Sequence, residues 1–295
     1  MTKRFFKSKI AYHYAHDPSA IVGSFLLLFF ILAALLAPWI APQNPYDLEK
    51  VSLSDFLKPP VWMEGSDPTF LLGTDDQGRG ILSTILYGCR TSLTVGFGVV
   101  LIAGSFGIAM GLLAGYYGGL LDSVTMRLAD SLFSFSTTLI AILMLGIFKQ
   151  SGVLIVIVAI CIADWVRYAR TMRGSVLEVK EEAYITAAKA TGAGDFRLLL
   201  KHLLPNAIPP IFVVLAVDLA VVIMLEATLS FLGVGVPLTE PSLGMMIAIG
   251  KNYVYAGKWW LVVFPGATLI LLVAGINLFA DWLREELNPK IEKQR

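Results

Sequence analysis

The sequence has few charged residues. Only 15% of its 295 residues are Asp, Glu, Lys or Arg, whereas soluble proteins average about 25%. Another 56% of the residues are hydrophobic. This shortage of charge excludes an ordinary soluble protein and predicts an integral membrane protein. The net charge of +1 gives no sign of a nucleic-acid-binding surface, so we expect no nucleic-acid partner.

The residues that most often carry chemistry are also scarce. Cys89 and Cys161 are too few and too far apart for a disulfide framework or a metal site, and we expect free thiols. The three histidines lie in segments that we expect to be cytoplasmic, namely His13, His16 and His202. An intramembrane enzyme would need a nucleophile and a base, or metal ligands, at membrane depth. The chain also lacks the G-x-x-x-x-G-K-[ST] phosphate loop. We therefore expect no bound cofactor or metal and no enzymatic activity.

Long apolar runs are abundant instead. A helix that crosses a bilayer needs roughly 20 mostly apolar residues. Six runs qualify, at residues 21–41, 93–115, 128–148, 151–170, 206–233 and 260–282. The first run lacks a small-residue cleavage site, so we interpret it as a retained span rather than a signal peptide. With segment 1–20 inside, most of the 23 Lys and Arg residues fall on the cytoplasmic side, as the positive-inside rule requires.

These runs predict an all-α membrane protein with six transmembrane helices. Both termini are expected in the cytoplasm, the second as a tail over residues 285–295. Residues 42–92, rich in Pro, Asp and Gly, are expected to form an external loop. Residues 93–284 would form a core of five helices, interrupted by a cytoplasmic hairpin at residues 178–204.

The hairpin has the features of a docking element. Residues 178–191 are rich in helix formers, and their alanines allow another surface to approach closely. Gly192 is expected to end this helix, Asp195 to cap the next one, and Pro205 to end that one. The second helix would carry an apolar side formed by Phe196, Leu199, Leu200 and Leu203. A hairpin that packs only on its own spans is the alternative.

Four stretches of the chain resemble the permeases of binding-protein-dependent ABC importers. TAAKATGAGDFRLLLKHLLP, residues 186–205, resembles the EAA loop of that family, which docks on the ATPase. It keeps Ala187, Gly192, Leu204 and Pro205 at the family's spacing, but has Thr186 and Thr191 where many members carry acidic residues. The departures suggest that the grip on the ATPase rests more on packing than on charge.

The other three stretches narrow the resemblance to one branch. LLGTDDQGRGILSTILYGCRTSL, residues 71–93, resembles the segment before the second span, with Gly80 where the usual residue is Asp. EATLSFLGVGV, residues 226–236, and DWLREELNPK, residues 281–290, match further along the chain. Together the four stretches imply the C-type permease subunit of the dipeptide/oligopeptide/nickel branch, with the type I ABC importer permease fold, in a bacterial inner membrane.

The resemblance implies partners and roles. A homologous second permease would complete the pathway, two ATPase subunits would use ATP and Mg, and an external solute-binding protein would select the substrate. The residues implied in coupling to the ATPase are Glu182, Thr186, Ala187, Ala188, Thr191, Gly192, Asp195, Leu204 and Pro205. Dipeptides or oligopeptides are the expected substrates, with nickel chelates, glutathione or other small solutes as alternatives. An ion-coupled secondary transporter is a further alternative, although we find no internal repeat of the kind such proteins carry.

Charged residues within the apolar runs are candidates for function. Asp164 precedes Arg167 by one helical turn, so we expect the two to pair locally. Asp218 and Glu226 lie eight residues apart, roughly on one helix face. We expect this face to point to the pathway or to the partner permease rather than to lipid. A structural carboxyl at the subunit interface is the alternative. Six glycines of the second run favour close helix packing, at positions 96, 98, 104, 107, 111 and 115.

Overall fold

The computed structural model describes residues 12, 14–47, 53–148, 152–237 and 239–287. Parts of the predicted segments 1–20 and 285–295 therefore lie outside the described residues. The described part of the chain is helical, with loops and one isolated bridge between Thr74 and Gly80. The α-helices are α2 (Pro18–Ile40), α3 (Ile81–Tyr117), α4 (Gly119–Phe133), α5 (Thr137–Phe148), α6 (Val153–Lys180), α7 (Ala183–Ala190), α8 (Asp195–Arg197), α9 (Leu204–Ala207), α10 (Pro209–Phe231), α11 (Leu243–Gly250) and α12 (Trp260–Glu286). Two segments are 3₁₀-helical, Leu53–Asp55 and Lys251–Ala256, and one is π-helical, Leu198–Leu203.

Four helices of the described chain are long and apolar enough to cross a membrane: α2, α3, α10 and α12. They coincide with the first, second, fifth and sixth predicted spans. The pair α4 and α5 adds a fifth span only if the two helices count as one. The remaining predicted span, residues 151–170, lies in α6, which carries Asp164, Arg167 and Arg170. The number of six spans stays a prediction.

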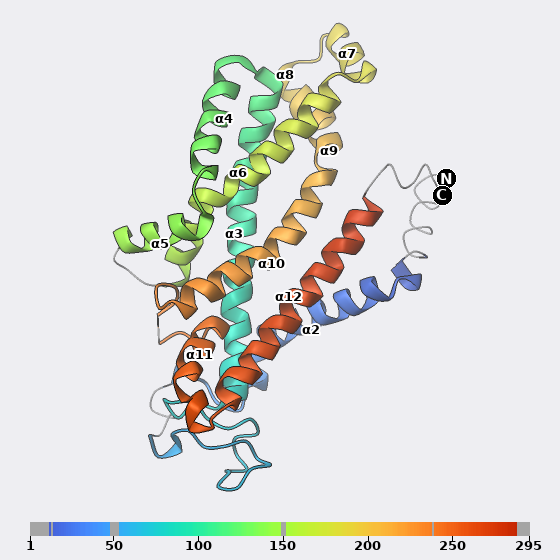
Figure 1. Cartoon of the computed structure of the whole chain (residues 1–295). Helices are drawn as coiled ribbons and strands as arrows, with labels where there is room; N and C mark the ends of the chain where they lie inside the picture. Colours follow the sequence, from blue (N-terminus) through green and yellow to red (C-terminus); the bar gives the residue numbers. More distant parts are fainter. Residues whose placement is uncertain (1–11, 13, 48–52, 149–151, 238, 288–295) are drawn as a thin grey trace.

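The predicted third span, residues 128–148, is wrong as a single helix. The chain bends by 89° between α4 and α5, and α5 leads away from the line of α4 in Figure 1. The backbone supplies a reason, since the N–H of Phe135 donates to the oxygen of Leu132 at 3.2 Å, three residues back, rather than in the four-residue pattern of an α-helix. This turn ends α4 before α5 begins at Thr137.

The predicted external loop at residues 42–92 is too long at its C-terminal end. Helix α3 begins at Ile81 rather than at residue 93. Its first turns contain polar residues, but their hydroxyls bond within the helix: Thr84 donates to the oxygen of Gly80 at 2.9 Å and Thr91 to that of Tyr87 at 3.2 Å. A helix can therefore continue through residues that look like loop in the sequence.

Helices α3 and α6 form the centre of the molecule and pack very closely. The predicted close packing at the six glycines of α3 is confirmed, because a Cβ at any of them would lie 2.9 Å or less from a neighbouring atom. A Cβ added at Gly107 would lie 2.4 Å from the backbone oxygen of Trp165 in α6, and a Cβ added at Gly111 would lie 2.4 Å from that of Ala169. Backbone contact of this kind leaves no space for a side chain, so only glycine fits at these two positions.

The remaining helices flank this pair. Helix α10 packs on α3 and α12, and α12 lies antiparallel beside α2, where a Cβ on Gly23 would meet the backbone of Phe279 at 2.6 Å. In Figure 1 the hairpin with α7 lies at one end of the molecule, and residues 53–80 with α11 lie at the other. The start of α2 and the end of α12 lie toward the hairpin. This arrangement is the one that the predicted topology requires, although the side of the membrane stays a prediction.

Candidate functional site

The first half of the hairpin has the predicted shape. Helix α6 ends at Lys180, and α7 follows after Glu181 and Glu182. Gly192 lies just beyond α7 with a φ of +82°, a conformation that glycine adopts without steric cost. The prediction that Gly192 ends the helix is confirmed.

Asp195 does not cap the second helix, so that prediction is wrong. It is the first residue of α8. The N-cap position is occupied by Gly194, and the cap of this helix has no side-chain hydrogen bond. Its Oδ1 instead accepts a hydrogen bond of 2.6 Å from the hydroxyl of Tyr116, the penultimate residue of α3. A local capping rule could not detect this partner, because it lies 79 residues away in the chain.

The second half of the hairpin also differs from the prediction. Pro205 does not end a helix, because α8, a π-helical segment at Leu198–Leu203 and α9 follow one another through it to Ala207. The four apolar residues predicted to share one side are divided: Leu199 and Leu203 are buried, whereas Phe196 and Leu200 are exposed. Wider π-helical turns rotate residues away from the 3.6-residue spacing on which the prediction rested.

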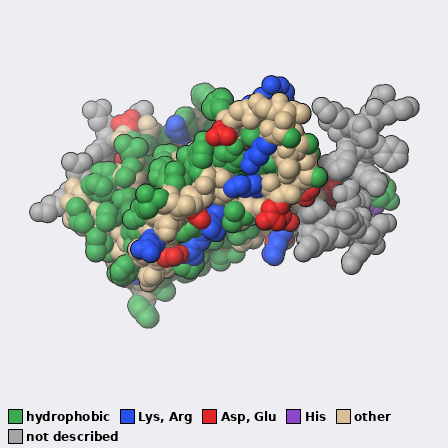
Figure 2. Space-filling view, turned by 90° about the horizontal axis from the view of Figure 1, so that it is seen from above, with side chains coloured by type: hydrophobic (Ala, Val, Ile, Leu, Met, Phe, Trp, Pro, Cys, Tyr) green, Lys and Arg blue, Asp and Glu red, His purple; other side chains and the backbone are tan. Residues whose placement is uncertain are grey.

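The inner side of the hairpin packs on its own spans. Ile185, Leu199 and Leu203 join residues of α3, α6 and α10 in one apolar cluster, which also contains Tyr116 and Ile211. The outer side is open. Among the predicted coupling residues, Glu182, Thr186, Ala187, Thr191, Gly192, Asp195 and Pro205 are exposed, while Ala188 and Leu204 are half-buried. The hairpin therefore combines both interpretations: it packs inward and presents a free surface outward. Figure 2, viewed from this end, shows acidic and basic side chains gathered over it.

A charged cluster links α6 to α10 inside the helical core. Asp218, fully buried, is ion-paired with Arg167 and accepts a hydrogen bond from the hydroxyl of Tyr168. The predicted local pair also forms, with Arg167 Nη2 3.8 Å from Asp164 Oδ1. The other oxygen of Asp164, Oδ2, is buried and has no hydrogen-bond partner among the residues that the structure describes. One half-exposed guanidinium thus stands between two buried carboxylates.

Glu226 is held by three hydroxyls. Ser230 and Ser242 donate to its Oε1, and Ser92 donates to its Oε2, each at 2.8 Å. These donors come from α10 itself, from the residue that caps α11, and from α3. Asp218 and Glu226 are both 0% exposed. In this conformation both carboxylates face the chain's own helices, and the expected place at the pathway or at the partner permease stays a prediction.

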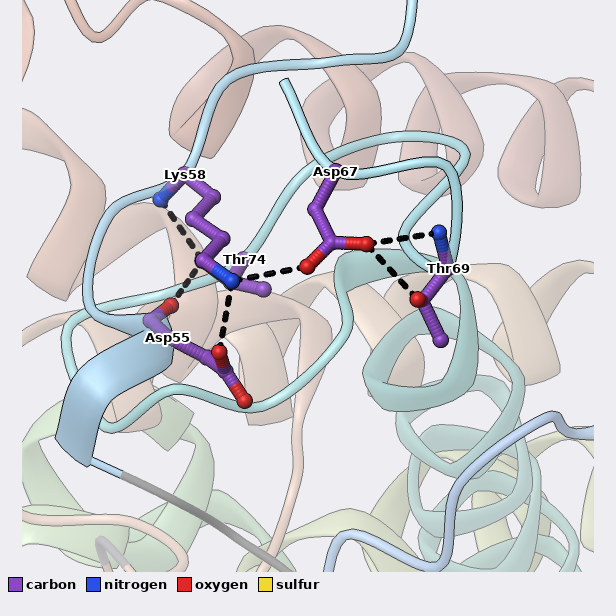
Figure 3. Close-up of polar contacts among 5 residues, drawn as sticks. All are labelled: Asp55, Lys58, Asp67, Thr69 and Thr74. Carbon is purple, nitrogen blue, oxygen red and sulfur yellow. Dashed lines mark hydrogen bonds and ion pairs between the residues drawn. The ribbon is translucent and has the colours of Figure 1, made fainter. Parts of the chain in front are cut away.

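The opposite end of the molecule carries a polar cluster in residues 53–80. Lys58 Nζ lies 2.7 Å from Asp55 Oδ1 and 2.8 Å from Asp67 Oδ2, and Asp67 also accepts hydrogen bonds from Thr69 (Figure 3). Thr74 donates to the backbone oxygen of Asp55 and accepts from the backbone of Lys58. The two carboxylates raise the pKa of Lys58, and the donors Lys58 and Thr69 lower the pKa of Asp67. These bonds tie three separate turns of the loop together.

Several of these partners were not foreseen from the sequence. From the sequence, no role is predicted for Tyr116, Ser92 or Ser242, and Arg167 is paired with Asp164 alone. Each makes its principal contact with a residue far along the chain, and a single sequence gives no signal for such contacts. Across the described residues, no group of three or more His, Cys, Asp and Glu side chains is placed to hold a metal ion.

Comparison with known proteins identifies the architecture. Residues 107–293 match the family described as the binding-protein-dependent transport system inner membrane component. The chain belongs to this family. Residues 1–60 of this inner membrane component match the N-terminal TM domain of oligopeptide transport permease C, which accords with the four stretches noted in the sequence.

Curated relatives resemble this inner membrane component over nearly its whole length. The dipeptide transport system permease protein DppC of Haemophilus influenzae is 37% identical, over 96% of this chain and 94% of that protein. The di/tripeptide transport system permease protein DppC of Pseudomonas aeruginosa is also 37% identical, over 95% and 90%. The probable D,D-dipeptide transport system permease protein DdpC of Escherichia coli is 32% identical, over 97% and 93%.

Solved structures support the fold of this inner membrane component. Two inward-facing structures of the MetNI methionine ABC transporter match with TM-scores of 0.54 and 0.56 at 19% and 20% identity, over 70% of this chain and 96% of theirs. The fold is that of a type I ABC importer permease. The protein is a multi-pass permease of the bacterial inner membrane, a transport subunit whose family works with ATPase and solute-binding partners.

Proposed function

We propose that this chain is the C-type permease subunit of an ATP-driven importer for dipeptides or oligopeptides. The relatives over nearly the full chain are named as dipeptide and di/tripeptide permeases, which supports the peptide class. The chain would form half of the translocation pathway, and a homologous second permease would form the other half. An external solute-binding protein would deliver the peptide.

The hairpin carries the proposal for energy coupling. Its outer side offers a small-residue surface with Thr186, Ala187 and Thr191 exposed, so a groove of another protein can approach the backbone of α7. We assign this surface to one of two ATPase subunits, which bind ATP and Mg. The nine residues implied by the EAA resemblance divide accordingly: the exposed members contact the ATPase, except Asp195, whose carboxylate accepts the Tyr116 hydroxyl, and Leu204 and Ala188, half-buried, hold the surface in shape.

The proposed mechanism is a rigid-body movement. ATP-driven closure of the ATPase pair would draw the two permeases' hairpins together, and the helices attached to each hairpin would rotate with it. The tight packing of α3 on α6 supports this, because the hairpin continues directly from α6 and a well-packed helix pair does not deform easily.

Two glycine positions give a matched test. A side chain at Gly192 is strained by the φ of +82°, whereas Gly194 has a φ of −68°, and neither position has a neighbour within 4 Å. We expect Gly192→Val to reduce co-purification of the ATPase subunits and uptake of labelled dipeptide by about ten-fold, which corresponds to roughly 1.4 kcal/mol and lies within the roughly 1–2 kcal/mol that the left-handed conformation costs a residue with a side chain. We expect Gly194→Ala to behave as wild type.

The outcomes separate the alternatives. Unchanged ATPase association and uptake in Gly192→Val would contradict docking at the hairpin. Absence of any co-purifying ATPase from the wild-type chain would favour an ion-coupled transporter. Uptake of nickel chelates or glutathione in place of labelled dipeptide would keep the importer and replace its substrate.

A further inference from the structure

Tyr116, near the end of α3, contacts three consecutive elements: the end of α6, α7 and α8. Its hydroxyl donates to Asp195 in α8 at 2.6 Å. The ammonium groups of Lys180, the last residue of α6, and Lys189 in α7 lie 5.6 and 5.3 Å from the centre of its ring. The side chain is 7% exposed. The Tyr116 side chain is therefore a junction of α6, α7 and α8: its ring lies under two ammonium groups, and its hydroxyl donates to a carboxylate.

Lys180 strengthens the same junction through the backbone. Its ammonium donates to the backbone oxygen of Tyr116 at 2.6 Å and lies 3.5 Å from that of Gly115. These carbonyls are among the last of α3, where a positive charge interacts favourably with the helix dipole. The end of α3 is therefore fixed to the start of the hairpin by side chain and main chain together.

The need for such a junction follows from the chain path. The hairpin is joined covalently only to α6 and, through α9, to α10. Helix α6 ends at Lys180, and the irregular residues Glu181 and Glu182 precede α7. Besides the apolar contacts of Ile185, Leu199 and Leu203, a polar link to α3 keeps the hairpin from pivoting there and leaving α3 behind. Helix α3 runs from this junction to Ile81, beside the polar cluster at the opposite end of the molecule.

We propose that Tyr116 is a positioning residue that locks the hairpin to α3 through Asp195, so that movement imposed on the hairpin reaches the far end of the permease. The inference rests on the proposed coupling role of the hairpin. It also gives Asp195 a different task from the implied one, since its carboxylate is directed to Tyr116 and holds the docking surface in place.

The test removes the hydroxyl and keeps the ring. Tyr116→Phe retains the apolar packing and both lysine contacts, so assembly with the ATPases is expected to stay normal. The number of peptides imported per ATP hydrolysed, measured in proteoliposomes of the complete transporter, is expected to fall by at least about five-fold, the lower end of typical coupling between sites. Tyr117→Phe, at the adjacent exposed tyrosine, is the matched control and is expected to keep the wild-type ratio.

Asp195 provides the second arm. Asp195→Ala is expected to lower the ratio as far as Tyr116→Phe does, and the double variant no further, because both substitutions remove one interaction. Asp195→Asn keeps an acceptor for the hydroxyl and is expected to restore most of the ratio. A wild-type ratio in Tyr116→Phe, or additive losses in the double variant, would overturn the inference. Where one single variant does not assemble, the other decides.

A distance measurement is independent of substrate. Spin labels at the exposed positions Leu101 in α3 and Arg197 in α8 are expected to give one narrow distance distribution with and without nucleotide. Tyr116→Phe is expected to broaden it, and an unchanged distribution would contradict the lock. If the wild-type complex took up no peptide, the proposed function would fail while these distances still decided the inference.

Discussion

Removal of Arg167 should destabilise the protein more than removal of any comparable surface arginine. Its guanidinium pairs with Asp218 and lies 3.8 Å from Asp164, and the side chains of these carboxylates are 0% and 3% exposed. Arg167→Met leaves both carboxylates buried without their cation. Breaking a buried pair costs about 3–5 kcal/mol, and we expect the lower end, about 3 kcal/mol, because the guanidinium itself is 40% exposed.

The charge count predicts an order among variants. Asp218→Asn leaves one cation beside one carboxylate, Asp164, so its cost should be smaller, about 1–3 kcal/mol. Arg170→Met breaks the ion pair between Arg170, whose side chain is 35% exposed, and Asp130, whose side chain is 69% exposed. Exposed ion pairs contribute about 0–1 kcal/mol to stability. Arg170→Met is therefore the matched control: the same substitution, one helical turn away.

The assay is thermal denaturation of the detergent-solubilised protein, followed by loss of the monodisperse peak in size-exclusion chromatography. With about 2–4 °C per kcal/mol for proteins of 150–250 residues, Arg167→Met should lower the melting temperature by about 6–12 °C. The double variant Arg167→Met/Asp218→Leu should recover part of this loss, because one stranded carboxylate is gone. Equal melting of Arg167→Met and Arg170→Met would refute the reasoning.

Two further predictions concern the helix packing and the polar cluster at the far end. Gly111→Leu should lower the melting temperature, because its Cβ would lie 2.4 Å from the Ala169 oxygen, whereas Gly146→Leu, with no neighbour within 4 Å, should not; equal melting would contradict close packing of α3 on α6. Because the pKa of Asp67 is lowered, the stability that its carboxylate gives the loop is present above the ordinary pKa of 3.8 and is lost as the pH falls through the lowered value. Because the pKa of Lys58 is raised, the stability that its ammonium gives the loop is lost only as the pH rises above 10.5. Hydrogen exchange of residues 53–80, corrected for its intrinsic pH dependence, should therefore quicken below pH 3.8 in the wild type and at neutral pH in Lys58→Met; slow exchange in that variant would show that the ion pairs do not hold the loop.

Hydropathy located the main helices well and failed where polar residues lie inside a helix. The first, fifth and sixth spans lie close to α2, α10 and α12. The start of α3 was placed twelve residues late, at residue 93 rather than Ile81, because hydroxyl groups that bond to their own helix look like loop residues in a sequence. The third span is broken after Phe133, where the N–H of Phe135 bonds three rather than four residues back, and an average over a window does not register such a turn.

The candidate site divides in a similar way. Gly192 was predicted from its residue type, since a φ of +82° is a local property that glycine alone adopts readily. Asp195 was misassigned because its partner, Tyr116, lies in another helix. The common face of Asp218 and Glu226 was foreseen, but helical spacing gives no information about what that face meets. Their partners became apparent only when α6, α3 and α11 were in place around α10.

The sequence by itself was enough to show that this is a membrane protein, to locate its main apolar helices and to indicate its family. Apolar length, the absence of a phosphate loop and the four matching stretches are properties of consecutive residues, so they do not depend on how the chain folds back. The tertiary structure alone decided where the charges go: Asp195 to Tyr116, Asp218 to Arg167, and Glu226 to three serines. The physical reason is that a buried polar group must find a partner, and in this helical protein most of these partners lie on helices that are distant in sequence.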